Sequence, residues 1–231
     1  EEGKFRKITE KSNWFFRVLE HPKEGPILMG QRMDSEGKFV GSIYKFVWQK
    51  KSFEKGPKMP FPGETKIFGL ALAPIRDKDK WDLIVLDDSD RLRVYAMDGK
   101  QLWNSKDYFG GTNNSYDTKK KKDMVYYRGG LPFDWRVYIP GRILVKDLQR
   151  DGINEVVINK NIPSTTRIFE MARSFDRGEI YGLIWDDDNL TTNWKTKEID
   201  GYISDFQVKD IDNDGDEELV VAVEDHVAPR G

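Results

Sequence analysis

The 231-residue chain has no cysteine and only two histidines, His21 and His226. Without cysteine it can form no disulfide, thiolate zinc site or thioether-linked haem, and it has no cysteine nucleophile. His21 precedes Pro22 in an expected turn and His226 lies near the C-terminus, so we expect both to be exposed and without a role. Neither a GxSxG nucleophile elbow nor a GxxxxGK[ST] phosphate loop is present. The sequence therefore gives little support to an enzyme.

An excess of one charge and long apolar runs are also missing. The chain has 38 Lys and Arg against 40 Asp and Glu, a formal charge of -2, which provides no overall basic field for nucleic acid. No apolar run approaches the roughly 18 residues of a transmembrane segment. The chain does have 13% aromatic residues, and a chain of this length can bury a sizeable core. We therefore expect a single domain over residues 1–231.

The apolar residues predict an all-β fold. They occur in short β-branched and aromatic runs bounded by Gly, Pro, Asn and Asp, and they lack the spacing of an amphipathic helix. The expected strands are 14–19, 27–31, 43–48, 67–73, 83–86, 92–97, 142–146, 155–159, 180–185, 203–208 and 218–223.

Two different motifs recur along the chain. The first is GSIYKFVW, matched by GEIYGLIW at Gly, Ile, Tyr and Trp, and the second is VKDLQRDGINEVV, matched by VKDIDNDGDEELV. The first motif occupies 41–48, 178–185 and, more weakly, 91–98, and the second occupies 145–157, 208–220 and, more weakly, 73–85. Because both motifs recur in the same relative order, the sequence indicates repeats of one structural unit.

The repeated unit is expected to be a four-stranded antiparallel meander, with an acidic loop after its first strand. About three and a half copies are expected, at 13–62, 63–111, 139–200 and 201–231, with an insertion loop at 112–138. Such a unit cannot bury both faces alone, and four-stranded units stacked radially form a β-propeller. Propellers usually have four to eight blades. Either the chain is part of a larger propeller, or its N-terminal strands complete the fourth blade.

The strongest chemical signal is the acidic segment 210–218, which has six carboxylates and no basic residue. Their repulsion in a fixed loop would cost several kcal/mol, and a Ca²⁺ ion, which takes six to eight oxygen ligands, would remove that cost. The expected ligands are the side chains of Asp210, Asp212, Asp214 and Glu218 and the backbone carbonyl of Asp216, with Glu217 facing solvent. An EF-hand is excluded because the twelfth position is Val221 and a strand follows. The alternative is a solvated acidic turn.

The two other copies of this loop are weaker candidates. The possible second calcium loop consists of Asp147, Gln149, Asp151, Ile153 and Glu155. It has fewer carboxylates than the first loop and a neighbouring Arg150. The sequence is therefore compatible both with a second Ca²⁺ site and with a loop that binds no ion. The third copy, at 73–85, has basic residues at ligand positions and is expected to bind no cation. Its Asp77 and Asp79 are expected to pair with neighbouring lysines.

Loops of the form DxDxDGxxE, followed directly by a hydrophobic strand and repeated about every 60 residues, resemble the FG-GAP or VCBS repeats of calcium-stabilised β-propellers. The resemblance is specific at 210–219, moderate at 147–156 and weak before residue 70. That family includes integrin α-subunit propellers and bacterial secreted or envelope proteins, and LRVYAMDGKQLW at 92–103 is most similar to the bacterial type. The resemblance implies an extracytoplasmic scaffold that is periplasmic, surface-exposed or secreted. In such a scaffold a bound calcium ion stabilises the inner loop of each blade. It implies no particular activity.

Three functions are compatible with these features. The first is a non-catalytic scaffold that binds Ca²⁺ and presents loops to a protein or glycan partner; a solvated loop tip is the alternative for its candidate surface. The proposed partner-binding residues lie in the insertion and are Lys119, Lys120, Lys121, Lys122, Tyr126, Tyr127 and Trp135. The second is a propeller enzyme, since AMDGKQLW at 96–103 resembles a repeat of quinone-dependent propellers. The third is a subunit of a surface assembly or an oligomer, because the incomplete fourth unit would leave unpaired strands at 203–223.

Overall fold

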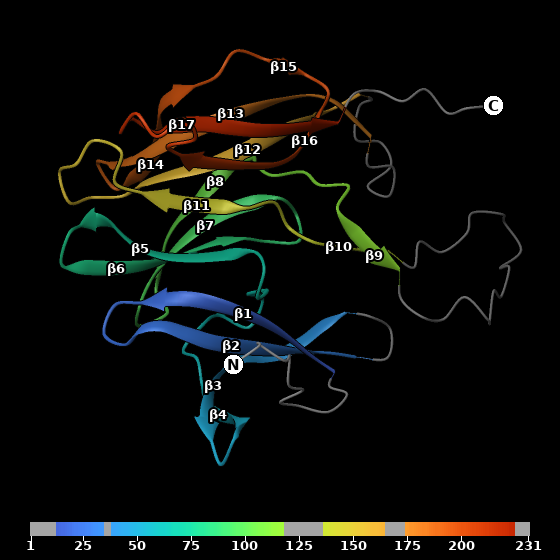
Figure 1. Cartoon of the computed structure of the whole chain (residues 1–231), viewed down its shortest axis with the longest axis vertical. Coiled ribbons are helices and arrows are strands. Elements are labelled where there is room, and N and C mark those ends of the chain that lie inside the picture. The colour runs from blue at the N-terminus through green and yellow to red at the C-terminus, as the bar shows by residue number, and fades with distance from the viewer. Residues whose placement is uncertain (1–12, 35–37, 118–135, 165–173, 225–231) are drawn as a thin grey trace, which may run out of the picture.

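The computed structural model describes residues 13–34, 38–117, 136–164 and 174–224 (Figure 1). All regular elements in these ranges are β-strands, so the all-β prediction is confirmed. The strands are β1 Trp14–His21, β2 Gly25–Met33, β3 Phe39–Gln49, β4 Ser52–Lys58, β5 Leu70–Asp77, β6 Lys80–Leu86, β7 Arg91–Ala96, β8 Gln101–Tyr108, β9 Ser115–Asp117, β10 Arg136–Tyr138, β11 Ile143–Lys146, β12 Glu155–Pro163, β13 Phe175–Asp186, β14 Asn189–Lys195, β15 Ile199–Asp200, β16 Tyr202–Lys209 and β17 Glu218–Glu224.

The strands form antiparallel meanders, as predicted. The first sheet is β1–β4, the second is β5–β8, and the third is β11–β14 with β15 added against β13. The last unit is the two-stranded β16–β17 hairpin, and β9 pairs with β10 inside the predicted insertion. Among the described residues no sheet closes on itself.

The first, second and third sheets follow one another in chain order along the longest axis of the molecule, and the β16–β17 hairpin lies against the third sheet (Figure 1). β1 contacts β5, β5 contacts β11, and both β12 and β13 contact β16. The first sheet therefore lies at one end of the stack and the β16–β17 hairpin at the other. The two middle sheets have a neighbour on each face.

The hydrophobic cores lie between neighbouring sheets. In β6, Leu83 and Val85 pack in the core shared with the first sheet, whereas Ile84 and Leu86 pack in the core shared with the third. Successive side chains of a strand point to opposite faces, so a strand covered on both sides can have apolar residues at consecutive positions. β12 follows the same rule between the second sheet and the hairpin. This explains the unbroken apolar runs in the middle of the repeats.

The tyrosines of the first repeated motif occupy equivalent third strands and meet charged partners. Tyr95 Oη on β7 donates to Glu64 Oε1 at 2.7 Å, and Tyr181 Oη on β13 donates to Glu179 Oε2 at 2.7 Å. Tyr44 on β3 instead lies under a lysine ammonium group, which is 3.7 Å from the ring centroid. The recurrence of this tyrosine therefore has a packing explanation in all three sheets.

An ion pair between Arg142 and Asp205 links the segment before β11 to β16. Arg142 Nε and Nη2 donate to the two carboxylate oxygens, each at 2.8 Å. These hydrogen bonds hold the pKa of Asp205 below its ordinary value of 3.8, although partial burial acts in the opposite direction. A lowered folded-state pKa means that the stabilisation is present above the unfolded pKa and is lost as the pH falls through the folded one.

Because both side chains are about half exposed, we expect this pair to contribute less than about 1 kcal/mol. Urea denaturation of the wild type and of Asp205→Asn at about pH 6 and about pH 3 checks this. We expect the wild type to lose more stability on acidification than the variant. An identical loss in both proteins would show that the pair contributes nothing.

Candidate metal centre

The acidic loop 210–217 connects β16 to β17, and its backbone shape follows from its sequence. Asn213 and Gly215 have positive φ angles of 63° and 97°, a conformation that glycine and asparagine adopt most readily. Asp210 holds the loop closed, since Asn213 N donates to Oδ1 at 2.6 Å and Gly215 N donates to Oδ2 at 3.0 Å. Ile211 N donates to Glu218 Oε2 at 3.0 Å across the base of the loop.

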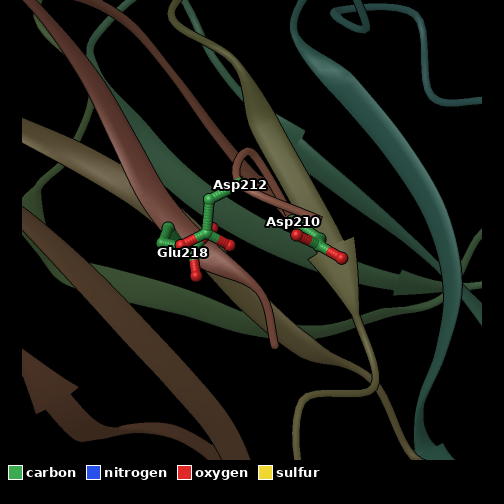
Figure 2. Close-up of side chains that lie close together, drawn as sticks. All are labelled: Asp210, Asp212 and Glu218. Atoms are coloured by element: carbon green, nitrogen blue, oxygen red, sulfur yellow. The ribbon is translucent and has the colours of Figure 1, made fainter. Parts of the chain in front are cut away.

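Three carboxylates of this loop lie together. One oxygen from each of Asp210, Asp212 and Glu218 lies within 4.8 Å of the others, so this group could hold a metal ion. Figure 2 shows the carboxylates of Asp212 and Glu218 close together, with Asp210 beside them. Within the described chain, Asp212 Oδ2 and Glu218 Oε1 accept no hydrogen bond. Oxygens that are not used by backbone amides remain able to bind a cation.

The other predicted residues of the loop lie outside this group. Asp214 Oδ1 accepts a hydrogen bond from Asp216 N at 2.9 Å, and neither residue belongs to the group of three. Glu217 does not simply face solvent as expected, because it pairs with Lys146 at the end of β11. The lysine brings a positive charge from the third sheet to the rim of the acidic loop.

The second loop, 147–155, shares three internal hydrogen bonds with the first. Gly152 N donates to Asp147 Oδ2 at 2.9 Å, Leu148 N donates to Glu155 Oε2 at 2.7 Å, and Ile153 N donates to Asp151 Oδ1 at 2.8 Å. These bonds correspond position by position to those in the loop before β17. The two sequence copies are therefore one structural motif.

The second loop nevertheless does not gather its acidic groups. Within the described part of the chain, the group at Asp210, Asp212 and Glu218 is the only cluster of three acidic or histidine side chains that is close enough for one ion. Gln149 takes the position that corresponds to Asp212, and Glu155 is buried at the base of the loop. The two loops therefore share a motif, but among the described residues only the loop before β17 brings three carboxylates close together.

The third copy is a tight turn between β5 and β6, and two of its acidic residues, Asp77 and Asp82, are paired with basic residues. Asp77 pairs with Lys80 at 3.3 Å, as the sequence predicts. Asp79 makes no ion pair with a lysine among the described residues; its backbone N donates to Asp77 Oδ1. A further pair was not expected from the sequence: Arg76 makes three hydrogen bonds of 2.7–3.0 Å to the buried Asp82.

The remaining predicted residues are of two kinds. The proposed partner-binding residues 119–122, 126, 127 and 135, together with His226, lie outside the described residues. His21 is partly buried, not exposed as expected, and its Nδ1 accepts a hydrogen bond from Lys23 N at 3.4 Å. It is the last residue of β1, and Oε1 of Glu24 in the following turn lies 3.9 Å from its Nδ1.

Comparison with known protein families and with curated proteins gives no match for this chain. Nowhere in its described portion is there a helix with the length and hydrophobicity needed to cross a membrane. Functional inference therefore depends on the acidic loop and on the arrangement of the sheets.

Proposed function

We propose that the chain is a non-catalytic, calcium-binding β-propeller scaffold in which the stacked sheets are blades and the 210–218 loop holds Ca²⁺. The observation that carries this proposal is the convergence of Asp210, Asp212 and Glu218 in a loop with a repeated architecture. In a solvated acidic turn the mutual repulsion of these carboxylates would act against their convergence, and a bound cation would remove that repulsion.

The donor set favours calcium over other metal ions. All three side chains offer carboxylate oxygens, and the loop has no histidine or cysteine, which zinc and copper sites normally use. The loop is largely exposed, so water and backbone carbonyls can complete a coordination number of six to eight. The irregular spacing of a loop suits Ca²⁺ better than the strict octahedron of Mg²⁺.

The meanders support the propeller part of the proposal. Three antiparallel meanders, two of four strands and one of four strands with β15 added, pack face to face in chain order, and a two-stranded unit continues the series. A blade needs neighbours on its faces to bury its apolar residues, which describes the two middle sheets. Because the repeats resemble FG-GAP repeats, we propose that the protein lies in the bacterial envelope or outside the cell. We also propose that its insertion loop, 112–138, binds a protein or glycan partner.

Calcium binding gives the direct test. We expect Ca²⁺ to raise the melting temperature and a chelator to lower it, and a site filled at 100 times its Kd would contribute about 2.7 kcal/mol. Asp212→Ala combined with Asp214→Ala should abolish the response. Differential scanning calorimetry with Ca²⁺, with Mg²⁺ and with chelator measures it.

The second loop provides the matched control. Gln149→Ala combined with Asp151→Ala changes the corresponding positions of a loop that shares three hydrogen bonds with the first, and this variant should keep the full calcium response. A wild-type melting curve that is the same with Ca²⁺ and with chelator would refute the calcium site. A response that disappears only in the 149/151 variant would place the ion in the other loop.

A further inference from the structure

Exposed apolar side chains concentrate at the two ends of the stack of sheets. The large exposed hydrophobic residues of the described chain are Val18, Val40, Trp48, Tyr108, Ile211, Val220 and Val223. All but Tyr108 belong to the first sheet, to the β16–β17 hairpin or to its loop. Isolated exposed apolar residues are normal on protein surfaces, but their concentration in the two end units of the stack points to contact surfaces there.

The outer face of the first sheet is aromatic. Phe15 packs toward the second sheet, so its neighbours Trp14 and Phe16 point to the opposite face. There they form edge-to-face contacts with Phe46, with ring centroids 5.1 and 4.9 Å apart. Val18 on the same side is 61% exposed. We call this surface the aromatic face.

The outer face of the β16–β17 hairpin combines two small apolar residues with acidic ones, Glu218 and Glu224. Val221 packs toward the third sheet, so Val220 and Ala222 point away from it. Their cross-strand partners are Gln207 and Asp205, and the Asp205 carboxylate is bound by Arg142. The hairpin packs on β12 and β13 of the third sheet, and Val220 and Ala222 lie on the side away from them, which we call the hairpin face.

The two ends carry opposite charges. Residues 14–58 have nine Lys and Arg against five Asp and Glu, a formal charge of +4, whereas residues 202–224 have one Lys against eight Asp and Glu, a charge of -7. A bound divalent cation would leave the second value at -5, so the contrast does not depend on calcium. Opposite charges on two surfaces steer their association and select its orientation.

We propose that a second copy of this chain covers these faces, with the aromatic face of one copy packed on the hairpin face of the next. This contact continues the stacking that already joins the first sheet to the second, the second to the third and the third to the hairpin. A head-to-tail contact brings the basic end against the acidic end. Antiparallel pairing of two β17 strands is disfavoured, because Glu218 and Glu224 of the two copies would be opposed.

Sedimentation velocity on the 231-residue chain tests the proposal. At low ionic strength and high micromolar concentration we expect species heavier than the 26.9 kDa monomer, and salt should weaken them because screening reduces the attraction. Val18→Asp and Val220→Asp should each weaken association about tenfold or more, since a carboxylate in the contact loses its water. Tyr108→Asp, on the second sheet, is the control and should associate like the wild type. A wild type that stays monomeric refutes the proposal.

Mixing the two variants tests the head-to-tail geometry. Val18→Asp retains a functional hairpin face and Val220→Asp retains a functional aromatic face, so the mixture should form one-to-one dimers and nothing larger. A contact that pairs like faces would show no such complementation, and that outcome would also overturn the proposal. Circular dichroism of each variant verifies that the monomer is folded, which is expected because both positions are exposed.

Discussion

Replacement of Arg76 by methionine is expected to lower the free energy of unfolding by about 3–5 kcal/mol. Asp82 on β6 is fully buried, and Arg76 is its ion-pair partner, through three hydrogen bonds. Methionine retains the apolar stem but leaves a carboxylate without a partner. The variant also removes the guanidinium that lies 5.8 Å from the Trp185 ring of the third sheet. Urea denaturation at neutral pH measures the loss.

The pH dependence of this variant separates a lost charge pair from lost packing. Burial raises the pKa of Asp82 above 3.8, and the hydrogen bonds from Arg76 oppose that rise. Without Arg76 the raised pKa remains, so the folded state binds a proton more readily than the unfolded state. The destabilisation should therefore be smaller at about pH 4 than at about pH 8.

Arg76→Met combined with Asp82→Leu is the matched control. Replacing both members of a buried pair by apolar residues is often neutral, so this protein should recover most of the lost stability. A double variant as unstable as Arg76→Met would contradict the explanation. A loss in Arg76→Met that does not change with pH would point to packing instead.

The sequence predicted the sheets well because their signals are local. Alternating or continuous apolar runs mark strands directly, and all eleven expected strands overlap observed ones. The strands that were missed are β4, β8, β9, β10, β14 and β15, which lie at sheet edges or are short. β14, for example, contains Asn189 and two threonines but little apolar sequence. Edge strands need less burial, so composition alone marks them poorly.

The sequence motif of the acidic loop predicts some of its side-chain positions and not others. The spacing of its aspartates identified a candidate cation site, and Asp210, Asp212 and Glu218 do lie together. Spacing could not show that Asp214 would turn aside to bond Asp216 N, nor that Lys146 would approach Glu217. Lys146 comes from another sheet, and such contacts depend on tertiary packing. The Arg76–Asp82 pair was missed because its partners belong to separate strands of a hairpin.

Asn161→Ala is the second substitution expected to have a large effect, about 3 kcal/mol or more. The buried side chain links three segments, because Nδ2 donates to Gly111 O at 2.8 Å and to Ile203 O at 2.9 Å, and Oδ1 accepts from Ile203 N at 3.0 Å. Alanine leaves two carbonyls and one N–H unsatisfied in the interior, and each such group costs about 1–3 kcal/mol. Chemical denaturation measures the total.

The location of the damage is as informative as its size. Two of the three bonds hold Ile203 on β16, so Asn161→Ala should loosen the hairpin that carries the acidic loop while the second sheet remains protected. Hydrogen exchange should accelerate at the amides of β16 and β17. Asn159→Ala is the matched control, because its side chain makes one bond, to Gly110 O at 3.0 Å, and it should lose about 1 kcal/mol with β16 unaffected. If both variants loosen the hairpin equally, Asn161 is not the link between the third sheet and the candidate metal centre.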